Sequence, residues 1–317
     1  MTTYRLGSSG EEVERIQARL QALGFYRGPV DGAFGGGTEA AAKAFQRSGG
    51  LDVDGAVGPI TWNALFNAEI PESSLSSRPL DYRCLALTGA FETNAGFPDC
   101  FAGLSGDFDG QGISFGVCQW NFGQDSLQPM LREMIEEHPG VVRSIFQERY
   151  GVLTAALDAD KRELMDFAAS IQHPVKHFVI EPWRGMFKSL GRTGEFQAIE
   201  QKYAGALYRA AVKLCADYGL WSQRATALMF DIKVQNGGIS SLVKAQVLAD
   251  FADLAPELPR EALETERMKI IAHRRAEAAN PRWVEDVRAR KLCIAKGEGV
   301  VHGVRYNLEE QFGIRLE

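Results

Sequence analysis

The chain has 317 residues, of which 45% are hydrophobic and 24% are charged, and its formal net charge is −6. This composition is typical of a soluble globular protein, and the length is sufficient for two domains. The negative charge argues against a nucleic-acid partner and against binding to an anionic membrane surface, since both select basic patches. No apolar stretch approaches the length that spans a bilayer, so we expect no membrane insertion.

The first element expected along the chain is a helix over residues 11–23, where apolar side chains recur on one face. Ser9 and Glu12 have the spacing of a capping box before this helix, and Gly24 can end it. The apolar side chains of the face are Val13, Ile16, Leu20 and Leu23.

A repeated turn follows this helix. The motif Asp31-Gly32-x-Phe34-Gly35-x-x-Thr38 returns as Asp54-Gly55-x-Val57-Gly58-x-x-Thr61. Asp-Gly favours a turn, and each threonine is placed where it can cap the next helix. We therefore expect three short helices that share a small core.

This pattern, over about residues 4–67, resembles the peptidoglycan-binding domain of bacterial and phage wall hydrolases. The resemblance implies that residues 1–68 hold the glycan or the stem peptide of the cell wall in a groove near the repeated loops. An unrelated three-helix domain with the same turn chemistry is the alternative. The motif residues assigned to this peptidoglycan anchor are Asp31, Phe34, Thr38, Asp54 and Thr61.

Residues 69–80 contain serines and two prolines and little apolar content, which indicates a linker that lets the flanking domains reorient.

A second domain is expected over residues 81–317. Its first helix begins at Asp81 and ends near Thr93-Asn94. Residues 95–124 are rich in Gly, Asp and Phe and include an alternating stretch, so they form the one expected β element. Further helices are expected over 127–137, 141–150, 161–170, 195–218, 223–234, 241–251 and 260–278. The fold class is therefore mainly α.

Two kinds of carboxyl group lie near the expected β element. Glu92 is near the C-terminus of an apolar-faced helix, where the helix dipole and partial burial favour the protonated form of a carboxyl group. Asp107 and Asp109 lie in a glycine-rich loop that water can reach, which favours the ionised form. A protonated and an ionised carboxyl group across a cleft are what glycosidic hydrolysis needs. A calcium loop is disfavoured because Cys118 stands where that motif requires glutamate, but plain turn-forming aspartates remain an alternative.

The stretch Phe91-Glu92-Thr93-Asn94, followed by Asp109-Gly110-Gln111-Gly112-Ile113-Ser114, resembles the catalytic motifs of family 46 chitosanases, which belong to the lysozyme superfamily. The resemblance implies a lysozyme-like α+β domain with a small β-hairpin or sheet. It also implies that Glu92 is the general acid, that Asp109 is the base and that Ser114 positions the attacking water. Gln111 and Ser114 replace the arginine and threonine of that family. Gly116-Val117-Cys118-Gln119 also fits the layout of goose-type lysozymes and lytic transglycosylases.

A group of four residues at the end of the β stretch is a candidate for sugar binding. Aromatic rings stack on sugars, and amides form hydrogen bonds with hydroxyl and acetamido groups. These residues are Gln119, Trp120, Asn121 and Gln124. The basic run over residues 288–291 is expected to form a solvated helix face. The five cysteines include no C-x-x-C pair and are expected to be buried free thiols. The histidines are scattered, so we expect no metal and no cofactor.

These observations predict a modular peptidoglycan hydrolase, specifically a muramidase that cleaves the β-1,4 bond between N-acetylmuramic acid and N-acetylglucosamine. A lytic transglycosylase, a chitosanase-like hydrolase and a non-catalytic wall-binding protein are the alternatives. The N-terminal residues lack the apolar region of a signal peptide. We therefore expect a monomer that stays in the cytoplasm of the producing cell and acts on the wall after release, as a phage endolysin freed by a holin or as an injected antibacterial effector.

Overall fold

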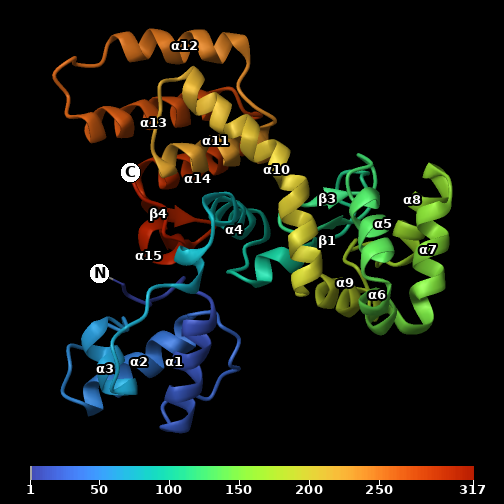
Figure 1. The fold of residues 1–317 in the computed structure, drawn as a ribbon, viewed down its shortest axis with the longest axis horizontal. Coiled ribbons are helices and arrows are strands. Elements are labelled where there is room, and N and C mark those ends of the chain that lie inside the picture. Colours follow the sequence, from blue (N-terminus) through green and yellow to red (C-terminus); the bar gives the residue numbers. More distant parts are fainter. Residues whose placement is uncertain (1) are drawn as a thin grey trace. The chain divides into compact units, whose positions relative to one another are not determined.

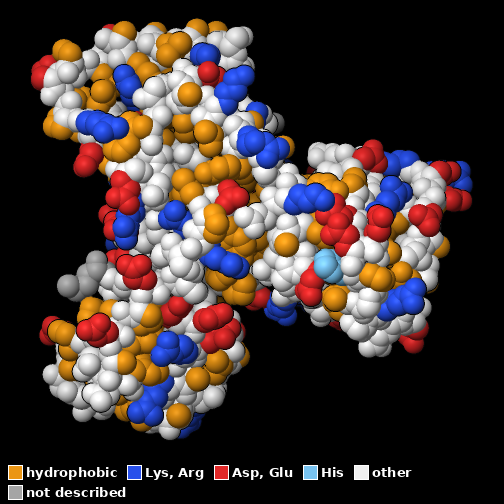
Figure 2. All heavy atoms as spheres, viewed as in Figure 1, with side chains coloured by type: hydrophobic (Ala, Val, Ile, Leu, Met, Phe, Trp, Pro, Cys, Tyr) orange, Lys and Arg blue, Asp and Glu red, His pale blue; other side chains and the backbone are white. Residues whose placement is uncertain are grey.

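The computed structural model describes residues 2–317 (Figure 1). The fold is mainly α with small antiparallel β elements, which confirms the predicted fold class. The chain divides into two compact units, one made of the chain up to Leu87 together with Leu207–Glu317 and the other of Thr88–Ala206. The domain boundaries expected at residues 68 and 80 remain predictions. On the face drawn in Figure 2, basic and acidic side chains are interspersed with hydrophobic ones.

The first unit begins with three short helices around one apolar core, as predicted. These helices are α1 (Glu11–Ala22), α2 (Gly36–Ser48) and α3 (Pro59–Phe66). Their core includes the fully buried side chains of Val13, Ile16, Leu20 and Trp62. Gly24, with a φ of 80°, follows the C-cap of α1 and its N–H donates to the carbonyl of Gln21, so the predicted helix end is confirmed.

The predicted helix caps are wrong. The N-caps of α1, α2 and α3 are Gly10, Gly35 and Gly58, and none provides a side-chain cap. Thr38 and Thr61 lie inside the first turns of α2 and α3 and are buried. Their hydroxyl groups instead accept hydrogen bonds from two buried glutamines, which sequence spacing alone does not reveal.

These two glutamines, Gln17 on α1 and Gln46 on α2, hold the repeated turns in the same way. The Gln17 side chain donates to Asp31 Oδ1 (2.8 Å) and Thr38 Oγ1 (3.1 Å). The Gln46 side chain donates to Asp54 Oδ1 (2.7 Å) and Thr61 Oγ1 (3.2 Å). Each glutamine also accepts a hydrogen bond from a turn glycine, at 2.9 Å and 2.8 Å respectively. Each helix therefore fixes the Asp-Gly turn that follows it.

The segment between residues 69 and 80 makes specific contacts within the first unit. It contains a 3₁₀ turn, η1 (Ser74–Ser77), in which Leu75 is buried. The backbone N–H of Ser74 donates to Glu12 Oε1 at 2.9 Å, so Glu12 is used here rather than in a capping box. The Tyr4 hydroxyl donates to the carbonyl of Pro71 at 3.0 Å. Reorientation about this segment stays a prediction.

The rest of the first unit is largely helical. Two long helices, α4 (Leu80–Thr93) and α10 (Gly194–Asp217), contribute to both units. The remaining elements are α11 (Gln223–Asn236), α12 (Ser241–Ala252), α13 (Arg260–Glu277), η4 (Pro281–Trp283), α14 (Val284–Lys296), β4 (Glu298–Val301), β5 (Val304–Asn307) and α15 (Leu308–Phe312). Strands β4 and β5 form a hairpin that sequence analysis missed. Its two-residue turn, His302-Gly303, has positive φ at both positions, which suits the twist of a hairpin.

A buried ion cluster joins α11 to α14. Asp231 is fully buried and contacts Arg290 and Lys291, which are themselves 2% and 0% exposed. Burial acts to raise the pKa of Asp231, but the two cations outweigh this effect and hold the pKa below its usual range. The expected solvated face over residues 288–291 is therefore wrong for Arg290 and Lys291, because Asp231 compensates their charge inside the fold.

The second unit packs five helices around a second apolar core. These helices are α5 (Gln128–Glu137), α6 (Pro139–Phe146), α7 (Tyr150–Asp158), α8 (Lys161–Ser170) and α9 (Trp183–Gly191), with short 3₁₀ turns η2 (Asp99–Ala102) and η3 (Gln147–Arg149). The expected β element is confirmed as a three-stranded antiparallel sheet in the order β1-β2-β3. The strands are β1 (Leu104–Ser105), β2 (Ser114–Phe115) and β3 (Trp120–Asn121). None of the helices within residues 2–317 combines the length and the apolar character that a bilayer span needs.

Candidate active site

Glu92 lies in the last turn of α4, and local interactions determine where that helix ends. Asn94 has a φ of 51°, a left-handed conformation that stops the helix. The Thr93 hydroxyl donates to the carbonyl of Gly89 (2.7 Å) and accepts from the N–H of Ala95 (3.2 Å). A side chain on Gly89 would lie 2.1 Å from Val117, so only glycine lets α4 pack this closely against the sheet region. Half-buried Glu92 is therefore held at a defined position.

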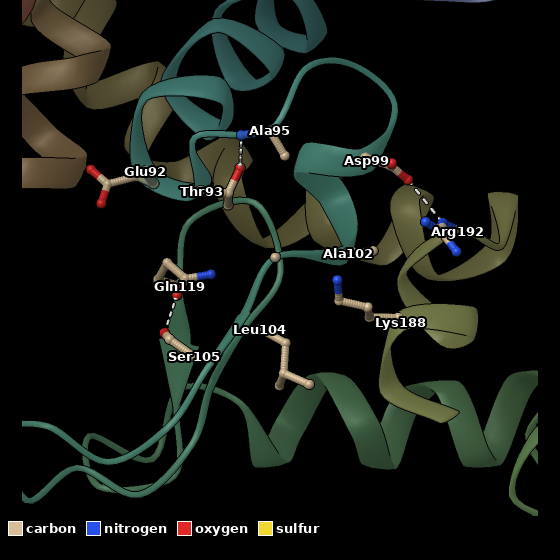
Figure 3. A pocket seen from close by; sticks show the side chains of 11 residues that line it. Glu92, Thr93, Ala95, Asp99, Ala102, Leu104, Ser105, Gln119, Lys188 and Arg192 are labelled. Atoms are coloured by element: carbon tan, nitrogen blue, oxygen red, sulfur yellow. Dashed lines mark hydrogen bonds and ion pairs between the residues drawn. The ribbon is translucent and has the colours of Figure 1, made fainter. Parts of the chain in front are cut away.

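Glu92 lines a pocket of about 250 Å³ within the second unit. Figure 3 shows Glu92 and Gln119 on one side of this pocket and Lys188, Asp99 and Arg192 on the other. The full lining consists of Glu92, Thr93, Ala95, Asp99, Ala102, Gly103, Leu104, Ser105, Gln119, Lys188 and Arg192. Of the residues predicted for the site, Glu92 and Gln119 are therefore brought together.

The Gly116–Gln119 turn holds Gln119 in the pocket wall. Gln119 has a φ of 55°, and its amide nitrogen donates to the carbonyl of Gly116 at 2.9 Å. Its amide oxygen accepts a hydrogen bond from the Ser105 hydroxyl at 2.6 Å (Figure 3). A side chain on Gly103 would lie 2.9 Å from the Gln119 amide, so the small residue leaves room for this arrangement.

A buried carboxyl group supports the same turn from behind. Glu200 on α10 is 0% exposed, and its Oε1 accepts a hydrogen bond from the backbone N–H of Val117 at 2.8 Å. Its other oxygen has no hydrogen-bond partner among residues 2–317. Burial raises the pKa of Glu200 well above its ordinary value, and the Val117 N–H opposes this effect only in part. A side chain on Gly116 would come within 2.2 Å of the carboxyl group.

The opposite wall of the pocket comes from the C-terminal end of α9. Gly191 lets this end approach η2, because a side chain there would lie 2.6 Å from Ala102 Cα. Lys188 extends from α9 into the pocket, on the other side from Glu92 (Figure 3). Arg192 donates from Nε to Asp99 Oδ1 at 2.8 Å, and both of these side chains are about half exposed. The pocket therefore combines two carboxyl groups, an amide and two cations.

Asp107 and Asp109 lie outside the lining of this pocket. Each uses one carboxylate oxygen to close its own loop, since Asp107 Oδ1 accepts from the Gly110 N–H (2.6 Å) and Asp109 Oδ1 from the Gln111 N–H (3.2 Å). Asp109 is exposed, as expected, whereas Asp107 is half-buried. The backbone N–H of Asp107 donates to the side chain of buried Gln172 at 2.6 Å, which fixes the loop.

The remaining predicted site residues also lie outside the pocket lining. Ser114 is half-buried on β2 and pairs across the sheet with Ser105 and Asn121. Asn121 is 7% exposed, and its amide oxygen accepts from the Gln124 N–H at 2.8 Å, so it supports a loop. Trp120 packs against the apolar core, while Gln124 is exposed. The role of Ser114 in positioning water and the roles of the other three in sugar binding stay predictions.

In the anchor, the structure shows that the repeated motif residues build the loops. Phe34, Thr38 and Thr61 are 2%, 1% and 5% exposed, and Asp31 and Asp54 accept hydrogen bonds from Gln17 and Gln46. Sequence analysis missed these glutamines because neither lies in the repeated motif.

Sequence analysis also missed the contributions of Ser105, Gln172, Lys188, Arg192 and Glu200. A signal existed for α9, where Trp183, Phe187 and Leu190 recur at helical spacing and are buried. No local pattern indicated that Lys188 and Arg192 line the same pocket as Glu92.

The cysteines are free thiols, and four of the five are buried. All five cysteines are free; Cys84, Cys100, Cys215 and Cys293 are buried, as predicted, whereas Cys118 is partly exposed. Burial raises the pKa of Cys215 and Cys293 to about 12, so these thiols are poor nucleophiles. Across residues 2–317, no group of three His, Cys, Asp or Glu side chains is arranged to hold a metal ion.

Comparison with known proteins confirms the resemblance seen at the N-terminus. Residues 9–65 match a family described as "Putative peptidoglycan binding domain". The chain is 48% identical over 62 residues to the spore cortex-lytic enzyme of Oceanobacillus iheyensis, which covers 20% of this chain and 22% of that protein. It is 44% identical over 75 residues to the N-acetylmuramoyl-L-alanine amidase CwlM of Mycobacterium tuberculosis, which covers 20% and 18%. The chain thus spans about a fifth of the length of these relatives.

Solved structures to which the chain shows some similarity include two chitosanases and a phage endolysin. The native chitosanase of Bacillus subtilis MY002 has a TM-score of 0.43 and 17% identity, over 70% of this chain and 87% of that chain. The chitosanase of Gynuella sunshinyii has a TM-score of 0.45 and 13% identity, over 72% and 96%. The Burkholderia AP3 phage endolysin has a TM-score of 0.20 and 17% identity, over 92% and 98%.

Proposed function

We propose that this protein is a peptidoglycan hydrolase whose N-terminal domain binds the cell wall and whose second domain cleaves the glycan. The observation that carries the proposal is the position of Glu92, a half-buried carboxyl group at a helix end that lines a pocket with Gln119. The match of residues 9–65 to a peptidoglycan-binding family supports peptidoglycan as the substrate.

In the proposed reaction, Glu92 protonates the oxygen that joins N-acetylmuramic acid to N-acetylglucosamine. The bond between this oxygen and the anomeric carbon then breaks, and water adds to the carbon. Asp109 is proposed as the base that takes the proton of this water, with Ser114 positioning it and Asp107 as the alternative base. The exposure of Asp109 supports this assignment, because a base that activates water must be reached by water.

A lytic transglycosylase is the second candidate. Such enzymes resemble this chain in their glutamate and Gly-x-x-Gln layout, and they need no aspartate base. The pocket favours this alternative in one respect, because Glu92 and Gln119 line it whereas Asp107 and Asp109 do not. The two reactions give different products, since hydrolysis leaves a reducing sugar and a transglycosylase leaves an anhydro-sugar.

The test is mass spectrometry of the soluble products after digestion of purified peptidoglycan. We expect reducing muropeptides ending in N-acetylmuramic acid from the wild type. Glu92→Gln should lower turnover by at least about 100-fold, because a positioned general acid contributes about 10²–10⁴-fold. Co-sedimentation of this variant with insoluble wall should remain at the wild-type level.

The same digestion separates the alternatives. Anhydro products that persist in both Asp107→Asn and Asp109→Asn would establish a transglycosylase. Substantial lysis by Glu92→Gln would show that Glu92 is not the general acid. Products from chitosan but none from peptidoglycan would identify a chitosanase, and binding without products from either polymer would identify a wall-binding protein.

We also propose a phage endolysin as the biological context, with an injected antibacterial effector as the alternative. In both cases a monomer would reach the wall after release from the producing cell. A neighbouring holin gene would support the first context, and a neighbouring immunity gene would support the second.

A further inference from the structure

The pocket at Glu92 carries an excess of positive charge when Glu92 is protonated, and this is the state that the proposed acid step requires. Its ionisable lining residues are Glu92, Asp99, Lys188 and Arg192. Asp99 compensates Arg192 through their ion pair. When Glu92 carries the proton that it donates, the charge of Lys188 remains without an acidic counterpart in the lining.

Lys188 has no ion-pair or hydrogen-bond partner among residues 2–317. Its side chain is half-buried on α9 and extends into the pocket (Figure 3). Most lysines pair loosely at the surface or remain fully solvated, whereas this side chain lines a pocket that also contains the cation Arg192. The arrangement suits an anionic group of a ligand rather than an internal partner.

The volume of the pocket limits what that group can be. At about 250 Å³ the pocket is smaller than typical pockets for whole ligands of drug size, which occupy about 300–1,000 Å³. It therefore holds only a small part of a bound polymer, such as the branch of a sugar next to the bond at Glu92. In peptidoglycan the acidic groups lie on a branch, because the carboxylates belong to the stem peptide or, where no peptide is attached, to the lactyl group of muramic acid.

We infer that this pocket binds a carboxylate of the lactyl-linked branch of muramic acid, with Lys188 as the counter-ion and Arg192 as a second contact. The inference rests on the proposed function and names the feature of the substrate that this site selects. Chitosan carries ammonium groups at every free glucosamine, and the charge of Lys188 would repel them. The pocket thus discriminates between two glycans that share the same type of bond.

The test compares three soluble substrates of equal length. The first is a glycan that carries stem peptides. The second is the same glycan with its peptides removed, which frees the lactyl carboxylates. The third is an N-acetylglucosamine oligomer without carboxylates. We expect Lys188→Gln to lower kcat/KM at least about tenfold on a carboxylate-bearing glycan, mainly through KM, and to leave the third substrate unchanged. Lys188→Arg should retain most of the wild-type value.

Two comparisons make the result specific. Lys202→Gln removes an exposed lysine of the same unit that pairs with Glu133, and it should change none of the three rates. The loss caused by Lys188→Gln should shrink at high salt, because salt screens an attraction between charges. A loss on the first glycan alone identifies a peptide carboxylate, and a loss on the second alone identifies the lactyl carboxylate, which the stem peptide blocks in the first. A loss on both shows that the pocket accepts either carboxylate.

Equal losses on all three substrates, or no loss on any, would overturn the inference. Binding to the Glu92→Gln protein separates this outcome from failure of the proposed function. A peptide-bearing disaccharide should bind that variant at least about tenfold more tightly than it binds the Glu92→Gln, Lys188→Gln double variant. This difference would persist if the chain cleaved no glycan, and equal affinities would overturn the inference independently of turnover.

Discussion

Glu200 illustrates at the residue scale how a buried carboxyl group can support an active site without contacting it. Its hydrogen bond to the Val117 N–H holds the turn that carries Gln119. Burial favours the neutral form, because an ionised carboxylate loses its hydration inside the fold. The folded chain therefore keeps the Glu200 proton to a higher pH than the unfolded chain does.

This difference predicts a pH dependence of stability. The contribution of the neutral carboxyl group is complete below the unfolded pKa of about 4.3 and is lost as the pH rises toward the raised folded pKa. Glu200→Gln keeps an oxygen acceptor for Val117 but cannot ionise, so its stability relative to the wild type should increase from pH 4 to pH 8. Thermal unfolding across this range measures the effect, with exposed Glu163→Gln as the control. Parallel profiles for the wild type and Glu200→Gln would contradict the assignment.

At the scale of elements, the anchor shows how one helix organises the next. Gln17 and Gln46 are buried on successive helices, and each binds the aspartate and the threonine of the following repeat. A neutral amide suits this position because it offers both a donor and an acceptor to the turn. The repeat in the sequence thus corresponds to a repeated hydrogen-bond network.

Gln17→Leu should therefore destabilise the N-terminal part of the chain. It leaves the backbone N–H groups of Asp31 and Gly32 without their side-chain acceptor, at a cost of about 1–3 kcal/mol for a buried group. Urea unfolding followed by tryptophan fluorescence detects the change, because Trp62, one of the five tryptophans of the chain, is buried in the same core. Gln21→Leu on the exposed part of α1 is the matched control and should have little effect.

For the whole molecule, wall binding and bond cleavage are proposed to reside in different parts of one chain. Tethering a catalytic domain to an insoluble polymer raises its effective concentration at the bonds it cuts, and a soluble fragment gains little from this effect. The two activities should therefore respond differently to substitutions in the two parts.

We expect Gln17→Leu to lower the release of soluble products from insoluble wall while leaving hydrolysis of soluble glycan close to the wild-type rate. Glu92→Gln should abolish cleavage of both substrates without lowering wall binding. Product release from sacculi and from soluble glycan, measured in parallel at one protein concentration, provides the comparison. If Gln17→Leu lowered the rate on soluble glycan as much as the rate on the wall, the two parts would not act separately.

Local patterns in the sequence determined the mainly α class, the three helices of the anchor, the sheet between α4 and α5, and the end of α4 just after Glu92. Each of these features depends on side chains within a few residues of one another, such as Thr93 with Gly89 and Ala95. Periodicity and turn chemistry report such interactions directly.

Only the tertiary structure decided which distant side chains meet. It buried Arg290 and Lys291 against Asp231, brought Gln17 to Asp31 and Thr38, and placed Lys188 opposite Glu92. A charged or amide side chain has the same local pattern whether it is solvated or paired. Its role is decided by the partner that packing brings to it, and that partner lies on another element of the fold.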